Sequence, residues 1–236
     1  MKKISFLMAA GFLLLFNSCK NTATENTAET TAAVTDSTPA AFNPFKLLLV
    51  RNSVKDFNKF KALYLSKDSL REAYGMSKYL LGRGLPDSNS LFVFDRISDV
   101  QKTKDFTASP ALKAAMKDAG TTSMPQFSYL EIIRLDDTPA ELKDRVMVVH
   151  KVKDFDTWLK AFDAEGKATR AQYGLMDRAV GRDLDDPNIV YLAFAVTDMA
   201  KAKARSASPE LKKIMEDAGV IGAPTQYMYK VDEYFK

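Results

Sequence analysis

The strongest constraint on the fold of this 236-residue chain is an internal repeat. Residues 54–57 (VKDF) recur at 152–155, and residues 71–125 align without a gap on 170–224 with 21 identical residues in 55 positions. Chance would give only a few identities, so the two segments are copies of one structural unit. The chain therefore folds the same unit twice, over residues 45–137 and again over 143–236.

Each copy is predicted to have the element order βαββαβ. Short β-branched runs bounded by turn residues indicate strands, and aromatic residues spaced by three and four indicate helices. The first copy begins with a strand at 46–50 and a helix at 56–74. A second strand then ends at residue 83, and a third covers 91–94. A helical region from 99 to 120 and a last strand at 126–134 complete the copy. The second copy repeats this order from 146–150 to 226–231. This is the order of a ferredoxin-like α+β fold.

Capping residues support the second helical region of each copy. Asp99 and Asp198 are placed as N-caps, since an aspartate can accept a hydrogen bond from the first free backbone N–H groups. The Ser-Pro pairs at 109–110 and 208–209 are expected to restart the helix, with serine as the cap and proline at the first helical position. A glycine at position 120 or 219 is expected to end it.

The first 44 residues carry a targeting signal. Two lysines precede the 13-residue apolar run 4–16, which is too short to span a bilayer and is typical of a secretory signal. The run ends in residues 16–19 (FNSC), which resemble the lipobox of bacterial lipoproteins, where the cysteine becomes lipidated after cleavage. We therefore expect residues 1–18 to be a signal peptide and Cys19 to be lipidated. A buried N-terminal helix, or an ordinary signal peptide with an incidental cysteine, is the alternative.

The segment 19–44 is expected to be a lipid-anchored flexible tether. It is rich in threonine and alanine and has few large apolar side chains, so it cannot bury enough surface to offset the entropy of ordering. A lipid at Cys19 followed by a polar tether predicts attachment to a membrane of the bacterial cell envelope, with the outer membrane as the expected location.

The composition excludes several kinds of chemistry. Cys19 is the only cysteine, so the folded part has no disulfide, cysteine-based zinc site or thiol nucleophile. His150 is the only histidine, which excludes a metal site with several histidine ligands, and we predict no metal and no cofactor. The net charge of +4 includes two lysines of the expected signal, and the remaining charges are interleaved, which argues against nucleic-acid binding. No phosphate loop or protease motif is present.

The repeated motifs resemble a known family. The VKDF helix entry, the Gly-Arg strand end, the turn 185–188 (DDPN) and the segment 208–220 resemble the dimeric α/β-barrel superfamily. Within it the resemblance is to uncharacterised relatives of antibiotic-biosynthesis-type monooxygenases; it covers residues 45–236 and is best in the second copy. Two βαββαβ subunits of that superfamily pack into one barrel, so this chain is expected to form a fused, pseudo-dimeric barrel. The superfamily includes cofactor-free oxygenases, haem-degrading enzymes and many proteins of unknown activity, so the fold alone carries little functional weight.

Three residues are candidates for ligand binding. His150 ends the first strand of the second copy, where relatives often carry a histidine, and could shuttle a proton or contact a ligand; Arg51 is its expected counterpart. The alternative is a strand-end histidine bonded to backbone. Arg83 and Arg182 end matching strands and could clamp a carboxylate or phosphate at the barrel mouth, or instead form salt bridges to aspartates of the adjacent turns.

Three functions follow from these observations. The first is a tethered module that binds a small apolar or aromatic molecule, the second is a cofactor-independent monooxygenase-like enzyme, and the third is a structural or partner-binding lipoprotein with a filled barrel. A deep cavity reaching His150 would favour the first two, and a solidly packed interior the third. Any pocket is expected beside the sheet of the second copy, with His150 and Arg182 at its polar end and apolar strand residues around it.

Overall fold

The computed structural model describes residues 42–136 and 141–235. The expected signal peptide, Cys19 and the tether up to residue 41 lie outside the described residues. No helix within the described ranges is both long and apolar enough to cross a bilayer.

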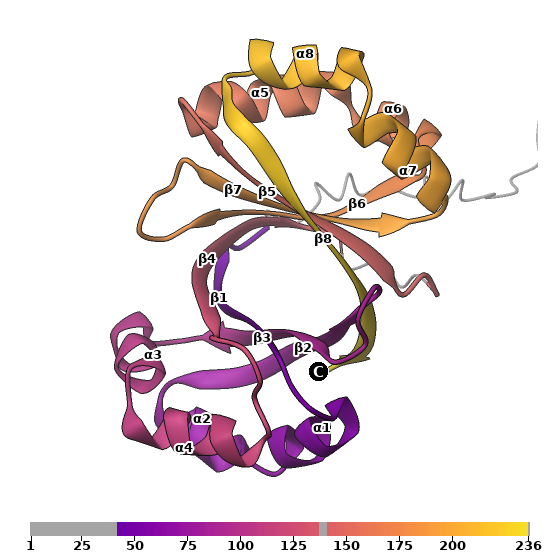
Figure 1. The fold of residues 1–236 in the computed structure, drawn as a ribbon. Coiled ribbons are helices and arrows are strands. Elements are labelled where there is room, and N and C mark those ends of the chain that lie inside the picture. Colours follow the sequence, from indigo (N-terminus) through magenta and orange to yellow (C-terminus); the bar gives the residue numbers. More distant parts are fainter. Residues whose placement is uncertain (1–41, 137–140, 236) are drawn as a thin grey trace, which may run out of the picture. The chain divides into compact units, whose positions relative to one another are not determined.

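Eight antiparallel strands form one closed barrel, in the order β1-β3-β2-β8-β5-β7-β6-β4 (Figure 1). Each repeat contributes four strands, as expected from the βαββαβ pattern. The strands are β1 (Phe45–Ser53), β2 (Met76–Gly84), β3 (Ser90–Ile97), β4 (Gln126–Leu135), β5 (Asp144–Val152), β6 (Leu175–Asp183), β7 (Ile189–Val196) and β8 (Val220–Tyr234).

The helices cover two opposite sides of the barrel, one set from each repeat (Figure 1). Repeat 1 supplies α1–α4 and repeat 2 supplies α5–α8. Their bounds are α1 (Phe57–Leu65), α2 (Asp68–Ala73), α3 (Val100–Thr107), α4 (Pro110–Asp118), α5 (Phe155–Glu165), α6 (Lys167–Gln172), α7 (Met199–Ser206) and α8 (Pro209–Asp217).

Two strand pairs between the repeats close the barrel. β2 pairs with β8, so that Arg83 lies opposite Lys230, and β4 pairs with β6, so that Glu131 lies opposite Arg182. β8 is longer than the predicted strand at 226–231 because its first part pairs with β5 and its last part with β2. The prediction of a fused pseudo-dimeric barrel is confirmed.

The prediction of one continuous helix at 56–74 is wrong, because the chain forms two short helices there. The side chain of Arg71 donates to the carbonyl of Tyr64 (2.7 Å), and Arg170 donates to the carbonyl of Phe162 (2.8 Å). Each arginine thus donates to a carbonyl in the last turn of the first helix, where intrahelical N–H partners run out. The Tyr64 carbonyl also accepts the backbone N–H of Lys67 (3.3 Å). In repeat 2 the break falls at Gly166, whose φ of +80° ends α5.

The predicted caps of the second helical region are confirmed. The carboxylates of Asp99 and Asp198 each accept a hydrogen bond from a backbone N–H three residues later (3.0 Å in both). Ser109 and Ser208 cap α4 and α8 in the same way (3.1 and 3.2 Å).

Side chains alternate along each strand between the barrel interior and the face covered by helices. On β5, Met147 belongs to the barrel core, while Val146 and Val148 pack toward the helices of repeat 2. A single sheet therefore forms the wall of two different interior spaces, one inside the barrel and one beneath the helices.

Candidate ligand-binding cavity

A cavity of about 900 Å³ lies between the outer face of the repeat-2 sheet and helices α5–α8. We call it the repeat-2 cavity. Its lining is mostly apolar, with a few polar side chains, as is typical of small-molecule sites. The lining includes His150, Trp158, Phe162, Glu165, Arg170, Tyr173, Leu192, Phe194, Met199, Arg205, Met215, Gln226 and Met228.

The equivalent space in repeat 1 measures only about 110 Å³. Leu63 lies nine residues after Val54, and Ala161 lies nine after Val152, so a smaller side chain lines the repeat-2 cavity. Strand pairing aligns Phe127 with Gln226, because Phe127 pairs with Val50 and Gln226 with Val148. Both differences leave a smaller side chain in repeat 2 and so contribute to the larger space there.

His150 lines this cavity, and its counterpart in repeat 1 is Asn52. His150 pairs with Val190 and Asn52 pairs with Leu91, which occupy the same place in their strands. The prediction that Arg51 is the counterpart of His150 is therefore wrong by one residue. A shift of one residue moves a strand side chain to the other face, and Arg51 stacks on the ring of Tyr227, 4.1 Å from its centroid.

The imidazole of His150 is buried without a hydrogen bond. The side chain is only 6% exposed, and neither ring nitrogen has a partner among the residues that the structure describes. In repeat 1 the amide of Asn52 donates to the hydroxyl of Thr121 (3.4 Å), but Val220 stands at the position of Thr121 in repeat 2. The backbone hydrogen bond of the alternative interpretation is thus not found within the described ranges.

Burial also sets the charge of His150. Desolvation lowers the pKa of the imidazole to about 4, so the ring is neutral at pH 7 and presents one N–H donor and one acceptor. The edge of the ring packs against Trp158, with ring centroids 5.3 Å apart and planes at 62°. Trp158 in turn stacks on Phe162 (5.3 Å, 24°), which gives this part of the cavity a flat aromatic wall.

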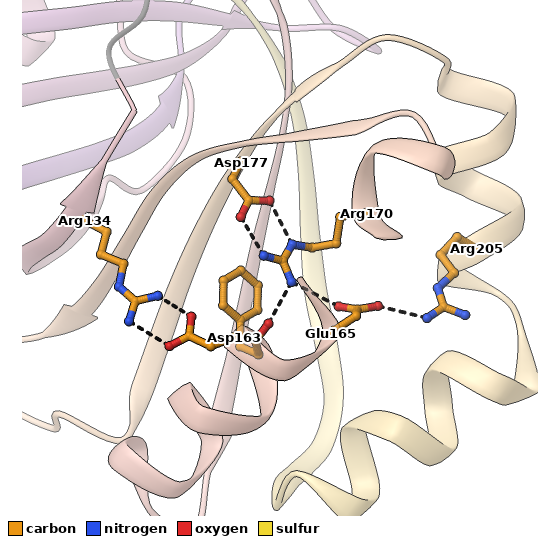
Figure 2. A network of polar contacts seen from close by, with 7 residues as sticks. Arg134, Asp163, Glu165, Arg170, Asp177 and Arg205 are labelled. Carbon is orange, nitrogen blue, oxygen red and sulfur yellow. Dashed lines mark hydrogen bonds and ion pairs between the residues drawn. The ribbon is translucent and has the colours of Figure 1, made fainter. Parts of the chain in front are cut away.

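A network of ion pairs lies at another part of the cavity wall (Figure 2). Arg170 binds both carboxylate oxygens of Asp177 (2.8 and 2.6 Å) and also reaches Glu165 (3.3 Å). Glu165 binds Arg205 with its other oxygen (3.0 Å), and the Arg205 guanidinium lies 4.4 Å above the Tyr173 ring. Largely buried charges need such pairing, because desolvation of an unpaired charge is costly.

The two polar groups lie at separate places along α5. Trp158, which contacts His150, and Glu165 are seven residues apart, which corresponds to about 10 Å along a helix axis. Other lining residues include Leu192, Phe194 and three methionines, whose flexible side chains adapt to ligand shape. The cavity thus offers a neutral imidazole and, about two helical turns away, a paired arginine.

Arg83 and Arg182 do not lie with His150. Arg83 donates to the backbone carbonyl of Ser88 (3.2 Å) and stacks on Phe57, and Arg182 forms an ion pair with Glu131 (2.7 Å). Both guanidinium groups pack against an aromatic residue on the helix side of the sheet rather than at the barrel mouth. Neither arginine lines the repeat-2 cavity, and neither uses the expected turn aspartate.

Sequence reasoning missed the residues Glu165, Arg170, Arg205 and Gln226. A comparison of the two copies position by position contains the signal, since Arg205 stands seven residues after its cap where repeat 1 has Phe106. Functional asymmetry shows in the positions where the copies differ, whereas the motifs that they share maintain the fold. The described residues contain no cluster of three or more side chains suited to hold a metal ion.

Comparison with known proteins gives likenesses in structure alone. No sequence-family model and no curated protein matches the chain. An anthrone oxidase-like protein superposes with a TM-score of 0.53 at 17% identity, over 82% of this chain and 93% of that protein. A protein from Lactobacillus acidophilus named as a monooxygenase gives 0.51 at 13% identity, over 81% and 95% of the two chains. A similarly named protein from Fusobacterium nucleatum gives 0.51 at 12%, over 80% and 93%.

These likenesses define the structural class of the chain. It has the ferredoxin-like α/β-barrel fold of monooxygenase-like proteins. In this protein a single polypeptide supplies both halves of the barrel, and the two halves differ most beneath their helices.

Proposed function

We propose that the protein binds a small, largely apolar molecule in the repeat-2 cavity. The observation that carries the proposal is His150, a buried imidazole that has no hydrogen-bond partner among the described residues and lies on the wall of a cavity of about 900 Å³. A buried polar group without a partner costs about 1–3 kcal/mol. A ligand that hydrogen-bonds to His150 removes this cost and therefore gains affinity there.

The lining indicates the chemistry of this ligand. Trp158 and Phe162 offer stacked rings, which suits a flat aromatic molecule. The neutral imidazole has one N–H donor and one acceptor nitrogen, so it can hydrogen-bond to a hydroxyl or a carbonyl group of a ligand. We therefore expect an aromatic ligand with a hydroxyl or carbonyl group beside His150. The repeat-2 cavity and a further cavity of about 800 Å³ inside the barrel argue against the third hypothesis, a structural protein with a filled barrel.

A cofactor-independent monooxygenase-like activity is the second candidate. The structural neighbours named as a monooxygenase and as anthrone oxidase-like support it at the level of fold. His150 is neutral at pH 7 and would accept a proton from a bound phenol only if the bound ligand raised the imidazole pKa from about 4. Consumption of dissolved oxygen in the presence of the ligand, lost in His150→Leu, would distinguish this enzyme from a binding protein.

We also propose that a lipid at Cys19 attaches the protein to the bacterial cell envelope, with the outer membrane as the expected site. The apolar run, the cysteine and the polar segment after it support this proposal. A membrane attachment suits a protein that captures poorly soluble molecules near a lipid surface.

Native mass spectrometry of the protein purified from its own host tests the binding function. The wild type is expected to carry a bound small molecule, and Gln226→Phe, which restores the phenylalanine of repeat 1, is expected to lose it. The matched control is Phe127→Gln, which changes the same position in repeat 1 and leaves the repeat-2 cavity intact. A wild type without any bound molecule, or equal occupancy in Gln226→Phe, would contradict the proposal.

A further inference from the structure

A second cavity of about 800 Å³ lies inside the barrel. We call it the barrel cavity. It lies on the opposite face of the sheet from the repeat-2 cavity, since Arg145 and Met147 of β5 line the barrel cavity while Val146 and Val148 line the other. Its ligand chemistry is therefore independent of the function proposed above.

The barrel cavity is lined by aliphatic side chains together with several aromatic rings. Buried side chains from both repeats form it, chiefly Leu47, Leu80, Leu130, Ile132 and Met147. Branched and flexible aliphatic side chains of this kind suit an alkyl chain. Another difference between the repeats enlarges this space. Ala193 of β7 occupies the position that Phe94 has on β3, and its side chain is smaller.

One end of the barrel cavity carries a buried positive charge. Arg145 is only 2% exposed, and its guanidinium donates to the carbonyls of Leu142 (2.7 Å) and Asp144 (3.1 Å) and to the hydroxyl of Tyr234 (3.3 Å). All these partners are neutral, and no carboxylate of residues 42–136 or 141–235 is recorded within ion-pair distance of Arg145. A buried charge whose partners are neutral is costly, and an anion beside it would offset that cost.

Tyr229 adds a hydrogen-bond donor at the same end. It lies directly opposite Arg145 in the β5–β8 ladder, where paired side chains are close neighbours, and it is only 3% exposed. Burial raises the pKa of Tyr229, so its phenol stays protonated and can donate to an anion. The lining also includes Arg96, which stacks on Phe45 (4.0 Å), and Glu141. It includes Arg178 too, which forms an ion pair with Asp136 (3.9 Å).

We propose that the barrel cavity binds an amphipathic carboxylate with an alkyl tail, such as a long-chain fatty acid. The carboxylate binds between Arg145 and Tyr229, and the tail packs against the aliphatic residues of both repeats. A guanidinium and a phenol form charge-assisted hydrogen bonds to a carboxylate, which are stronger than those between neutral groups. An alcohol with the same tail lacks that charge and binds more weakly.

Photolabelling of the whole chain in isolated membranes tests this site. The probes are a diazirine-bearing palmitic acid and the corresponding diazirine-bearing alcohol, and labelled peptides are mapped by mass spectrometry. The acid is expected to label peptides that contain the barrel residues Leu80, Leu130 and Met147, at least fivefold more than the alcohol does. Labelling confined to the repeat-2 helices or the surface, or equal labelling by the two probes, would overturn the proposal.

Variants identify the group that binds the carboxylate. Arg145→Gln is expected to reduce labelling by the acid at least fivefold without changing labelling by the alcohol, and Arg145→Lys is expected to retain it in part. Arg134→Gln, which removes an exposed arginine, is the control and should label like the wild type. If Arg145→Gln does not fold, Ala193→Phe provides the second test, because a phenylalanine there narrows the cavity and is expected to reduce labelling at least fivefold. Normal labelling of Arg145→Gln or of Ala193→Phe would contradict the site.

Discussion

Replacing His150 with leucine should change how the folding stability of the protein depends on pH. The folded protein holds the imidazole neutral in an apolar cavity, with a pKa of about 4, while the unfolded chain has the ordinary value of 6.5. As the pH falls below 6.5, the unfolded chain binds a proton that the folded protein does not. The wild type therefore loses stability between pH 6.5 and pH 4, whereas His150→Leu lacks this loss.

The size of the effect follows from the difference in pKa. Each unit corresponds to about 1.4 kcal/mol, so His150 should lower the free energy of unfolding by about 2 kcal/mol between pH 7 and pH 5. The full loss approaches about 3 kcal/mol at pH 4. His150→Leu should therefore retain about 2 kcal/mol more stability than the wild type over the same change in pH.

Asp95 of repeat 1 provides a control of opposite sign. Burial raises the pKa of this carboxyl group from 3.8 to about 6, although it accepts a hydrogen bond from Tyr64 (2.5 Å). The folded protein takes up its proton first as the pH falls from 7 to 5, which stabilises it by about 1 kcal/mol. Asp95→Asn removes that gain and should therefore lose more stability than the wild type between pH 7 and pH 5.

Urea unfolding at pH 7 and pH 5 measures these differences. Trp158 is the only tryptophan and contacts His150, so its fluorescence follows repeat 2, while circular dichroism follows the whole barrel. The quantity compared is the change in the free energy of unfolding between pH 7 and pH 5 in each variant. The part of the substitution's effect on stability that does not depend on pH cancels in this difference. If His150→Leu showed the same change as the wild type, His150 would titrate as an exposed histidine and the buried site would be refuted.

Three further predictions concern the ionic network, the turns and the membrane anchor. Arg170→Met should lower the free energy of unfolding by about 3–5 kcal/mol in urea titrations, since it leaves the largely buried carboxylate of Asp177 without its ion pair. Arg134→Met at an exposed pair should cost less than about 1 kcal/mol. Gly174→Ala should lower the melting temperature far more than Gly222→Ala: both glycines have positive φ, but only at Gly174 would the new Cβ meet a carbonyl oxygen, at 2.5 Å. Cys19→Ala should move the protein from the membrane fraction to the soluble fraction, and unchanged association would contradict lipidation.

The sequence alone determined the repeated unit and most of its boundaries. Strand and helix periodicities depend on the local alternation of apolar residues, and caps such as Asp99 or Ser208 act on backbone groups only three residues away. The asymmetry between the copies was also visible, because only the second one contains a histidine. These features need no knowledge of distant contacts, so a single sequence was enough to predict them.

The sequence did not predict the details of the site, because these depend on packing between distant residues. The one-residue error in the counterpart of His150 arose because register is set by pairing with β7, 40 residues further on. Arg182 binds Glu131 across the seam between the repeats rather than the aspartate of its own turn. Sequence proximity suggested the wrong partner for this arginine.

Only the tertiary structure decided that repeat 2 contains a large cavity. A change from leucine to alanine or from phenylalanine to glutamine is small in sequence, and each position was compatible with a filled core. Ala161 and Gln226, 65 residues apart in the chain, line the same space between helix and sheet, so their smaller side chains add to one cavity. Close packing makes interior volume a property of all the side chains that meet there, and only the folded chain determines which side chains meet.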